Sequence, residues 1–376
     1  MRVLWLIEAT GGGTARHVVE LASGLAEQGL KIHIVFSPRR ADAVWVRGSD
    51  QLVERGVRLI PLSMRASPEL NDPRKLYWLR NYIVKHGPFD LSHGHSSKGG
   101  ALSRLLRIGG GPPSVYTPHA FATLRSGIQG KIYSLAERAL APYTAALIAV
   151  SPEEAEEAQR LGYSKERVRV IPNGLDPTSF RPLSRCEARD RLGLPQEMQV
   201  VGFLGRLDSQ KNPDLLLSAF SLVATHFPRA LLVFTGEGPL RQLLVTRASA
   251  LGLIDRVRFL GFRPPEEVLP AYDILALPSR YEGFPYVLIE ALLSGLPIIA
   301  TRTGGAALAV VEESNGYLIP RDDALALARA LTNLLGSQSL RKKMGIAARE
   351  RAHKFSLKQM VVSTLDLYRD LVDFEQ

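Results

Sequence analysis

The chain has 376 residues, enough for about two domains of ordinary size, and a formal net charge of +10. Its hydrophobic content of 45% and charged content of 22% are typical of a globular protein. One cysteine, Cys186, excludes an internal disulfide and any multi-cysteine metal site. No apolar run approaches the roughly 18 residues of a membrane span, and the opening MRVLWLIEAT, interrupted by Glu8, predicts a strand and not a signal peptide.

Apolar runs typical of strands alternate with helical patterns through the first half of the chain. The runs cover residues 3–7, 31–36, 59–62, 90–95, 114–118 and 146–151. A glycine loop follows the first run, and a helix is expected from His17 to Gln28. This alternation predicts a parallel, doubly wound sheet.

The same rhythm restarts after a polar, proline-rich linker at residues 172–199. The strand-like runs of the second half cover 199–205, 230–236, 256–261, 273–278 and 297–302. Residues 356–374 predict one amphipathic helix that packs back on the first half. We therefore expect an α/β fold of two facing Rossmann-like domains, 1–171 with 356–376 and 172–355, with ligands in the cleft between the carboxyl ends of their strands.

The stretch Tyr281–Glu290 (YEGFPYVLIE) places two carboxylates, Glu282 and Glu290, around the start of a predicted helix. Pro285 is expected at the first helical position, and Gly295 is expected to end the helix. Unpaired N–H groups of residues 286–288 would face a diphosphate, while the carboxylates would accept hydrogen bonds from sugar hydroxyls. The alternative is a solvated loop residue and an ordinary helix surface.

Three further loops follow strands of the second half. Arg206 and Lys211, between the first strand and a helix, could neutralise a diphosphate without a metal. Gly236 ends the next strand, and Arg263 after the third could meet a nucleobase. For each basic residue taken alone, the alternative is an exposed cation without a ligand. For the glycine, the alternative is an ordinary turn.

In the first half, the loop Gly11–His17 could admit a ligand to its backbone and favours an anion. It lacks the third glycine of the dinucleotide fingerprint, since Arg16 stands there. His93 and His95 stand two apart on one strand and would point to the same face, but a metal pair would lack a third ligand nearby. His119 follows the fifth strand and is the better functional candidate. The alternative is a structural histidine whose hydrogen bonds are satisfied within the protein.

Basic residues concentrate in three segments of the first half, 74–85, 98–107 and 125–138, interleaved with Leu, Tyr and Trp. Such helices often lie on anionic membrane surfaces, although a solvated face is the plainer alternative. No block of five like charges and no RNA-binding signature occurs, which argues against a nucleic-acid partner.

Taken in order, these pieces resemble the retaining GT-B glycosyltransferases of family 4 over almost the full length. The matching pieces are Gly11–Gly13, His119, Arg206 with Lys211, Glu282 with Glu290, and Gly304-Gly305. The stretch SHGHSSKGG…VYTPHAF is similar to the branch that builds exopolysaccharide, capsule or O-antigen units on a polyprenyl-diphosphate carrier. One departure is Leu308, where the family often has Glu.

The resemblance implies a retaining, metal-independent hexosyltransferase without a cofactor, cytoplasmic or peripheral on the inner face of the membrane. Its donor would be a nucleoside-diphosphate sugar, expected to be a UDP-sugar carrying a hexose or N-acetylhexosamine, and its acceptor a polyprenyl-diphosphate-linked saccharide. Alternatives are a nucleotide-sugar epimerase of the same architecture and a non-catalytic sugar-nucleotide-binding subunit of a membrane synthase.

The resemblance also implies site roles. Catalysis would involve His119, beside the transferred sugar, with Glu282, Arg206 and Lys211. The implied donor-binding residues are Arg206, Lys211, Gly236, Arg263, Glu282, Gly283, Phe284, Pro285, Val287, Leu288 and Glu290. The acceptor side would be lined by Gly12, Gly13, His17 and His95.

Overall fold

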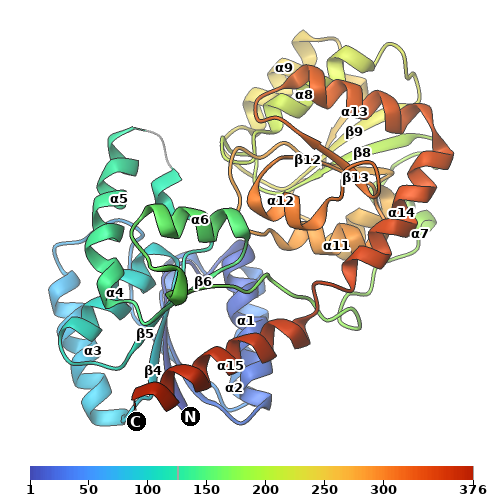
Figure 1. Cartoon of the computed structure of the whole chain (residues 1–376). Coiled ribbons are helices and arrows are strands. Elements are labelled where there is room, and N and C mark those ends of the chain that lie inside the picture. The colour runs from blue at the N-terminus through green and yellow to red at the C-terminus, as the bar shows by residue number, and fades with distance from the viewer. Residues whose placement is uncertain (125–126, 376) are drawn as a thin grey trace. The chain divides into compact units, whose positions relative to one another are not determined.

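A computed structural model describes residues 1–124 and 127–375 (Figure 1). The chain divides into unit 1, residues 1–174 and 357–376, and unit 2, residues 175–356. No helix among the described residues is long and apolar enough to cross a membrane.

Unit 1 is a parallel sheet covered by helices. Its strands are β1 (Arg2–Ile7), β2 (Lys31–Phe36), β3 (Arg58–Pro61), β4 (Leu91–His95), β5 (Ser114–Thr117), β6 (Ala146–Ala149) and β7 (Val168–Val170). Its helices are α1 (Gly12–Glu27), α2 (Ala43–Glu54), α3 (Asp72–His86), α4 (Ser96–Ile108), α5 (Ile128–Leu140), α6 (Pro152–Arg160) and α15 (Leu357–Glu375). The strand order β3-β2-β1-β4-β5-β6-β7 makes β1 the strand beside which the winding reverses.

Unit 2 repeats this design with the order β10-β9-β8-β11-β12-β13, again all parallel. Its strands are β8 (Gln199–Leu204), β9 (Ala230–Thr235), β10 (Val257–Phe259), β11 (Ile274–Leu277), β12 (Ile298–Thr301) and β13 (Gly316–Ile319). Its helices are α7 (Arg185–Leu192), α8 (Pro213–Val223), α9 (Arg241–Ala250), α10 (Pro265–Val268), α11 (Tyr286–Ser294), α12 (Gly304–Ala309), α13 (Ala324–Gly336) and α14 (Gln338–Ala352). The two doubly wound α/β units expected from the alternating pattern are both present.

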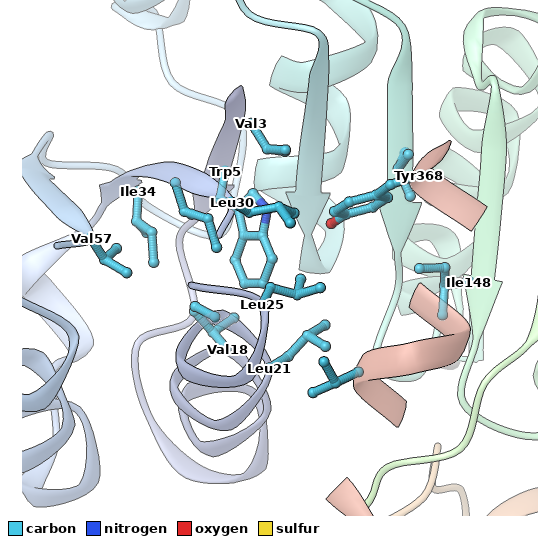
Figure 2. Close-up of a cluster of buried hydrophobic side chains, with 14 of the residues drawn as sticks. Val3, Trp5, Val18, Leu21, Leu25, Leu30, Ile34, Val57, Ile148 and Tyr368 are labelled. Atoms are coloured by element: carbon cyan, nitrogen blue, oxygen red, sulfur yellow. The ribbon is translucent and has the colours of Figure 1, made fainter. Parts of the chain in front are cut away.

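The core of unit 1 forms because β1 is apolar from Val3 to Ile7 and is covered by helices, as central parallel strands are. Trp5 of β1 lies at its centre, and Figure 2 shows side chains of α1 and of α15 around the indole. Helix α15 packs closely on α1, since a Cβ at Gly24 would lie only 2.4 Å from Val361 Cγ2. The Tyr368 hydroxyl, also from α15, hydrogen-bonds His93 Nδ1 on β4.

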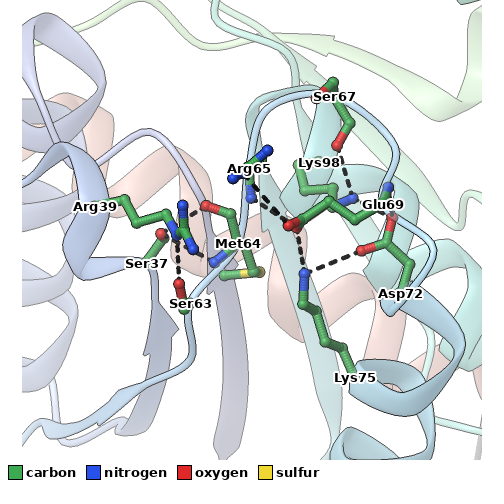
Figure 3. Close-up of polar contacts among 10 residues, drawn as sticks. All are labelled: Ser37, Arg39, Ser63, Met64, Arg65, Ser67, Glu69, Asp72, Lys75 and Lys98. Atoms are coloured by element: carbon green, nitrogen blue, oxygen red, sulfur yellow. Dashed lines mark hydrogen bonds and ion pairs between the residues drawn. The ribbon is translucent and has the colours of Figure 1, made fainter.

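Some basic side chains of two of the three basic segments are buried in ion pairs. Lys75 of α3 is buried and pairs with Glu69 and Asp72, and Lys98 of α4 is buried against Asp72 (Figure 3). Arg104 is fully buried beside the carboxylate of Glu137. Burial thus removes Lys98 and Arg104 from any cationic surface of the segment 98–107. Helices α3 and α5 keep exposed cations, and the membrane-surface interpretation stays a prediction for them.

Candidate functional site

Ligands of open parallel sheets bind at the carboxyl ends of the strands, where the strand order reverses. In unit 1 this point lies between β1 and β4, and in unit 2 between β8 and β11. The acceptor-side residues follow or end β1 and β4, and Lys211 and Glu282 follow β8 and β11. The acceptor-side residues, and Lys211 with Glu282, thus lie at the reversal point of their own sheet.

In unit 2, Lys211 and Glu282 are in direct contact. Lys211 Nζ lies 2.6 Å from Glu282 Oε1, and only 13% and 11% of the two side chains is exposed. Arg206 differs, because its guanidinium is largely exposed and lies 2.8 Å from Asp208 Oδ2. The loop after β8 therefore carries Lys211 in a mostly buried pair with Glu282, and a solvent-exposed arginine, Arg206.

The Lys211 loop is held by residues that the sequence analysis did not single out. Arg280 donates its backbone N–H to Gln210 O at 2.8 Å and its guanidinium to Ser209 O at 3.0 Å. Arg280 Nε and Asn212 Nδ2 both donate to Asp322 Oδ1, at 3.0 and 2.9 Å. This bracing fixes the loop after β8 against the loop after β11, which keeps Lys211 beside Glu282.

Helix α11 begins one residue later than expected. Pro285 is its N-cap with extended backbone, and Gly295 ends it at a φ of 70°. The N–H of Leu288, expected to be unpaired, donates to Pro285 O at 3.1 Å, because the first turn tightens. Val287 is half-buried in that turn, and Glu290 is buried in the next one.

The loop preceding α11 requires a glycine in the neighbouring helix. A Cβ at Gly305 of α12 would lie 2.2 Å from Gly283 O and 2.6 Å from Phe284 Cα. The Phe284 ring packs at 4.8 Å on Phe355, which buries it. Gly304-Gly305 therefore does more than form a turn, because it lets α12 support the Glu282–Pro285 loop. Leu308 is half-buried on α12, and its carbonyl accepts from Arg351.

The remaining donor-side candidates lie at neighbouring strand ends. Gly236 has a φ of 128°, and a Cβ there would lie 2.0 Å from Gly205 O, so the loops after β8 and β9 pack backbone to backbone. Arg263 is exposed after β10, and its guanidinium donates at 3.5 Å to the carbonyl of Phe262. The structure thus does not bring Arg263 into contact with Lys211 or Glu282.

In unit 1, α1 starts at Gly12, five residues before the expected start. Gly12 and Gly13 form its first turn, and the Gly12 N–H donates to Asp42 Oδ2 at 2.7 Å. A carboxylate therefore already caps this helix start and would repel an anion. The anion-binding interpretation of the glycine loop is weakened, whereas a contact with hydroxyl groups remains compatible with it.

Three acceptor-side and catalytic candidates meet in a histidine cluster, which we define as His17, His95 and His119. One ring nitrogen from each lies within 4.8 Å of the other two. His95 Nδ1 lies 3.2 Å from His119 Nε2, and the rings of His17 and His119 meet edge to face at 4.5 Å. His17 and His95 are buried, while His119 is partly exposed.

Burial governs the charge of this cluster. Loss of hydration lowers the pKa of His17 to about 4, although its hydrogen bond to Asn173 opposes the shift. The same cause holds the pKa values of His95 and His119 well below the ordinary value. The three imidazoles are therefore neutral near pH 7. The sequence predicted no third histidine near His93 and His95, but in the structure His17 and His119 lie beside His95. His93 is not part of this cluster and hydrogen-bonds Thr117 and Tyr368 instead.

Glu154 of α6 holds the backbone that presents His119. His119 and Ala120 have φ values of 57° and 75°, a left-handed conformation that non-glycine residues rarely adopt. The buried Glu154 carboxylate accepts from the N–H groups of Ala120 and Val150, at 2.6 and 2.7 Å. No sequence signal marks Glu154, which lies among four glutamates of one short helix.

We expect Glu154 to make the stability of unit 1 depend on pH. Burial raises the pKa of Glu154 from 4.5 to about 7, against the two backbone hydrogen bonds that favour the carboxylate. Between about pH 4.5 and 7 the folded protein keeps a proton on Glu154 that the unfolded chain has released, so Glu154 by itself lowers the free energy of unfolding by about 3 kcal/mol as pH rises through this window. The buried histidines, whose pKa values are lowered, act in the opposite direction. Glu154→Gln should remove this contribution, so that in chemical denaturation series at pH 5, 6, 7 and 8 the free energy of unfolding of the variant rises with pH relative to that of the unaltered protein. Glu156→Gln, on the exposed face of α6, is the matched control, and an unchanged slope in Glu154→Gln would contradict the assignment.

Comparison with known families gives two matches that together cover most of the chain. The model described as "Glycosyl transferase 4-like domain" matches residues 12–174. The model described as "Glycosyl transferases group 1" matches residues 184–351.

Curated relatives match along the whole chain. A D-inositol 3-phosphate glycosyltransferase of Corynebacterium diphtheriae is 30% identical over 375 residues, covering 92% of this chain and 86% of the relative. A protein of the same name from Salinispora tropica is 31% identical and covers 96% of this chain and 81% of its own.

Solved structures share the fold. Sucrose-phosphate synthase from Thermosynechococcus elongatus superposes with a TM-score of 0.82 at 24% identity, covering 99% of both chains. Anabaena HepE in complex with UDP and glucose gives 0.82 at 20% identity, covering 98% of this chain and 99% of that one. With the two parallel sheets described above, these likenesses establish the GT-B fold class.

Proposed function

Because the chain belongs to the family 4 glycosyltransferases, we propose that it moves a hexose or N-acetylhexosamine from a UDP-sugar to a hydroxyl of a phosphate-bearing acceptor. The observation that carries this proposal is the mostly buried Lys211–Glu282 pair at the reversal point of unit 2. A cation there suits the diphosphate of the donor, and a carboxylate beside it suits sugar hydroxyls.

The donor roles follow from this pair. Lys211 and Arg206 would bind the diphosphate, with Arg206 leaving Asp208 to do so. Glu282 and the backbone of 283–285 would contact the sugar, and the buried Glu290 would hold the ribose. HepE, whose structures contain UDP and glucose, shares the fold and supports UDP as the nucleotide.

For the acceptor we propose a polyprenyl-diphosphate-linked saccharide, as in the surface-polysaccharide branch that the HGHSSKGG stretch resembles. A second candidate is an inositol phosphate, favoured by the names of the relatives that match along most of the chain. Both acceptors combine free hydroxyls with phosphate. In either case the histidine cluster with Gly12 and Gly13 would line the acceptor side.

We further propose a retaining reaction without a metal, in which the donor phosphate takes the acceptor proton on the face of attack. His119 would lie beside the transferred sugar. Neutral imidazole at this position can donate or accept a hydrogen bond. The epimerase and the non-catalytic binding subunit remain as alternatives for the experiment to separate.

The test is a panel of UDP-, GDP- and TDP-sugars incubated with the full chain, alone, with membrane lipid extract, or with inositol phosphate. Nucleotide release that requires the extract supports the polyprenyl acceptor, and release that requires inositol phosphate supports the second candidate. Sugar conversion without any acceptor indicates an epimerase. Thermal stabilisation without turnover under all conditions indicates a binding subunit.

We also propose that unit 1 rests on an anionic membrane surface, as a peripheral protein of the cytoplasmic face, through α5. Ile128, Ile132 and Leu135 lie on one face of this helix and are 77%, 59% and 72% exposed. The exposed cations Lys131 and Arg138 flank that face, a pattern typical of interfacial helices.

The charge reversal Lys131→Glu with Arg138→Glu should weaken binding to phosphatidylglycerol-containing vesicles at least about tenfold, since each basic residue near such a surface contributes about 1 kcal/mol. Sedimentation with vesicles measures this. Reversal of the exposed Lys342 and Lys343 of α14 is the matched control. Equal binding of the unaltered protein to neutral vesicles would remove the electrostatic argument.

A further inference from the structure

A buried carboxylate at the carboxyl edge of unit 1 has no part in the transfer chemistry proposed above. Glu8 directly follows β1, and only 3% of it is exposed. Its Oε2 lies 3.3 Å from Arg40 Nη1, whereas its Oε1 is buried without a hydrogen-bond partner among the described residues. A buried polar atom without a partner is costly in a folded protein. A ligand that donates a hydrogen bond to Oε1 would remove this cost.

A second unpaired polar atom follows the neighbouring strand. His95 of β4 pairs with Ile7 of β1. Glu8 and Ser96 are the next residues along these two strands, which lie about 4.8 Å apart. Helix α4 begins at Ser96 and packs on β1, since a Cβ at Gly99 would lie 2.1 Å from a carbonyl oxygen of that strand. Ser96 Oγ is buried and has no hydrogen-bond partner in the described part of the chain, so two unpaired polar groups follow adjacent strands at the reversal point of the sheet.

The contact with Arg40 shows that the carboxylate lies just beneath the surface. This arginine ends the 3₁₀ helix Pro38–Arg40 after β2, and 48% of its side chain is exposed. Because the guanidinium meets both solvent and Glu8, the carboxylate does not lie deep in the core. A Cβ at Gly11 would lie 2.8 Å from Arg40 O, so the same segment also lies against the glycine loop. The cation compensates the charge of Glu8 and leaves Oε1 for a ligand.

We propose that Glu8 and Ser96 form a subsite that binds neighbouring hydroxyl groups of the acceptor. This inference rests on the proposed sugar transfer, and it names the part of the acceptor that unit 1 recognises. A carboxylate oxygen only accepts hydrogen bonds, whereas a serine hydroxyl can donate and accept, so the pair suits a sugar or another polyol. The subsite does not suit the phosphate of the acceptor, because Glu8 and Asp42 both place carboxylates at this edge. The saccharide and the inositol ring share the hydroxyl chemistry, and two probes distinguish them.

The test measures equilibrium binding of these probes to the full chain by calorimetry, with and without UDP. The probes are inositol phosphate and a polyprenyl-diphosphate-linked N-acetylglucosamine in detergent. We expect at least one to bind, and Glu8→Gln to weaken its binding about tenfold, because a hydrogen bond to a charged group is roughly twice as strong as one to a neutral group. The affinity for UDP should stay unchanged. Glu27→Gln, which alters a carboxylate 2.8 Å from Arg55 at the other end of α1, is the matched control and should bind both probes as the unaltered protein does.

Monodeoxy analogues of the bound probe separate recognition from a structural role of Glu8. In the unaltered protein, the analogue that lacks the recognised hydroxyl should bind more weakly than its parent, by about tenfold. In Glu8→Gln this difference should largely vanish, because the carboxylate and the hydroxyl are partners in one hydrogen bond. If every analogue shows the same difference in both proteins, Glu8 has only a structural role and the proposal is wrong.

Ser96→Gly is the second variant, in case circular dichroism shows that Glu8→Gln is unfolded. Glycine accepts the backbone of Ser96, whose φ is 58°, and loss of the hydroxyl should weaken binding of the probe about threefold or more. The proposal is overturned if neither probe binds the unaltered protein, or if the folded variants bind the probes with unchanged affinity. A probe that binds through Glu8 and yet receives no sugar from any donor of the panel contradicts the transfer proposal and leaves the subsite supported.

Discussion

Replacing Lys211 with methionine should lower kcat/KM for the UDP-sugar at least about 100-fold, the loss seen when one preorganised stabiliser of developing charge is removed. Methionine keeps most of the side-chain volume, so the effect isolates the charge. The ammonium lies 2.6 Å from Glu282 in a mostly buried position. Without it, the carboxylate would stand unpaired and would repel the donor diphosphate. The thermal stabilisation by UDP should disappear together with turnover.

A double-mutant cycle separates binding from folding in this prediction. Lys211→Met alone should also destabilise unit 2, because it leaves a buried charge without its partner. Adding Glu282→Gln should restore stability without restoring UDP-dependent stabilisation. Lys343→Met, exposed on α14, should change neither quantity. If UDP stabilises the Lys211→Met protein as strongly as the original, the assignment of Lys211 to the phosphate site is wrong.

The central strands of both sheets could be predicted because parallel strands buried on both faces are continuous apolar runs. Two strands escaped prediction, β7 (Val168–Val170) and β13 (Gly316–Ile319). Both are short strands at the edge of a sheet, where one side needs no partner strand and the apolar signal is weak. Helix α7 was missed inside the predicted linker, because RCEARDRL is too polar to show a helical stripe.

The start of α1 shows why a helix boundary can depend on distant residues. Glycine is a poor helix former, so the apolar pattern predicted a start at His17. The actual first turn, Gly12-Gly13, is capped by Asp42, thirty residues away along the chain. No local pattern could reveal that hydrogen bond.

The residues of the candidate site likewise include some that the sequence could predict and some that only the fold reveals. Arg206, Lys211, Glu282 and Glu290 could be proposed from their places after strands and around one helix start. Their bracing by Arg280 and Asp322 could not, because these are ordinary loop residues joined only by the fold. The histidine cluster could be predicted only in part. His95 ends one strand and His119 follows another, but His17 joins them only because β1 and β4 are neighbours.

His119→Asn should lower kcat by about 100-fold or more while leaving the thermal stabilisation by UDP unchanged. Asparagine tolerates the left-handed backbone that His119 adopts at a φ of 57°, so the turn held by Glu154 is retained and the imidazole alone is lost. If His119 acts beside the sugar during transfer, kcat and kcat/KM fall together, because the interaction is made in the transition state.

A merely structural role of His119 predicts a different pattern. The variant would then unfold at a lower temperature, and the molecules that remain folded would turn over at nearly the original rate. His226→Asn, exposed in unit 2, provides the matched control for the loss of an imidazole. Comparing turnover per folded molecule at a temperature well below both transitions decides between the two. A folded His119→Asn protein that keeps more than about a tenth of the original kcat would place His119 outside the catalytic set, since one preorganised hydrogen-bonding group in an active site contributes about 10²–10³-fold.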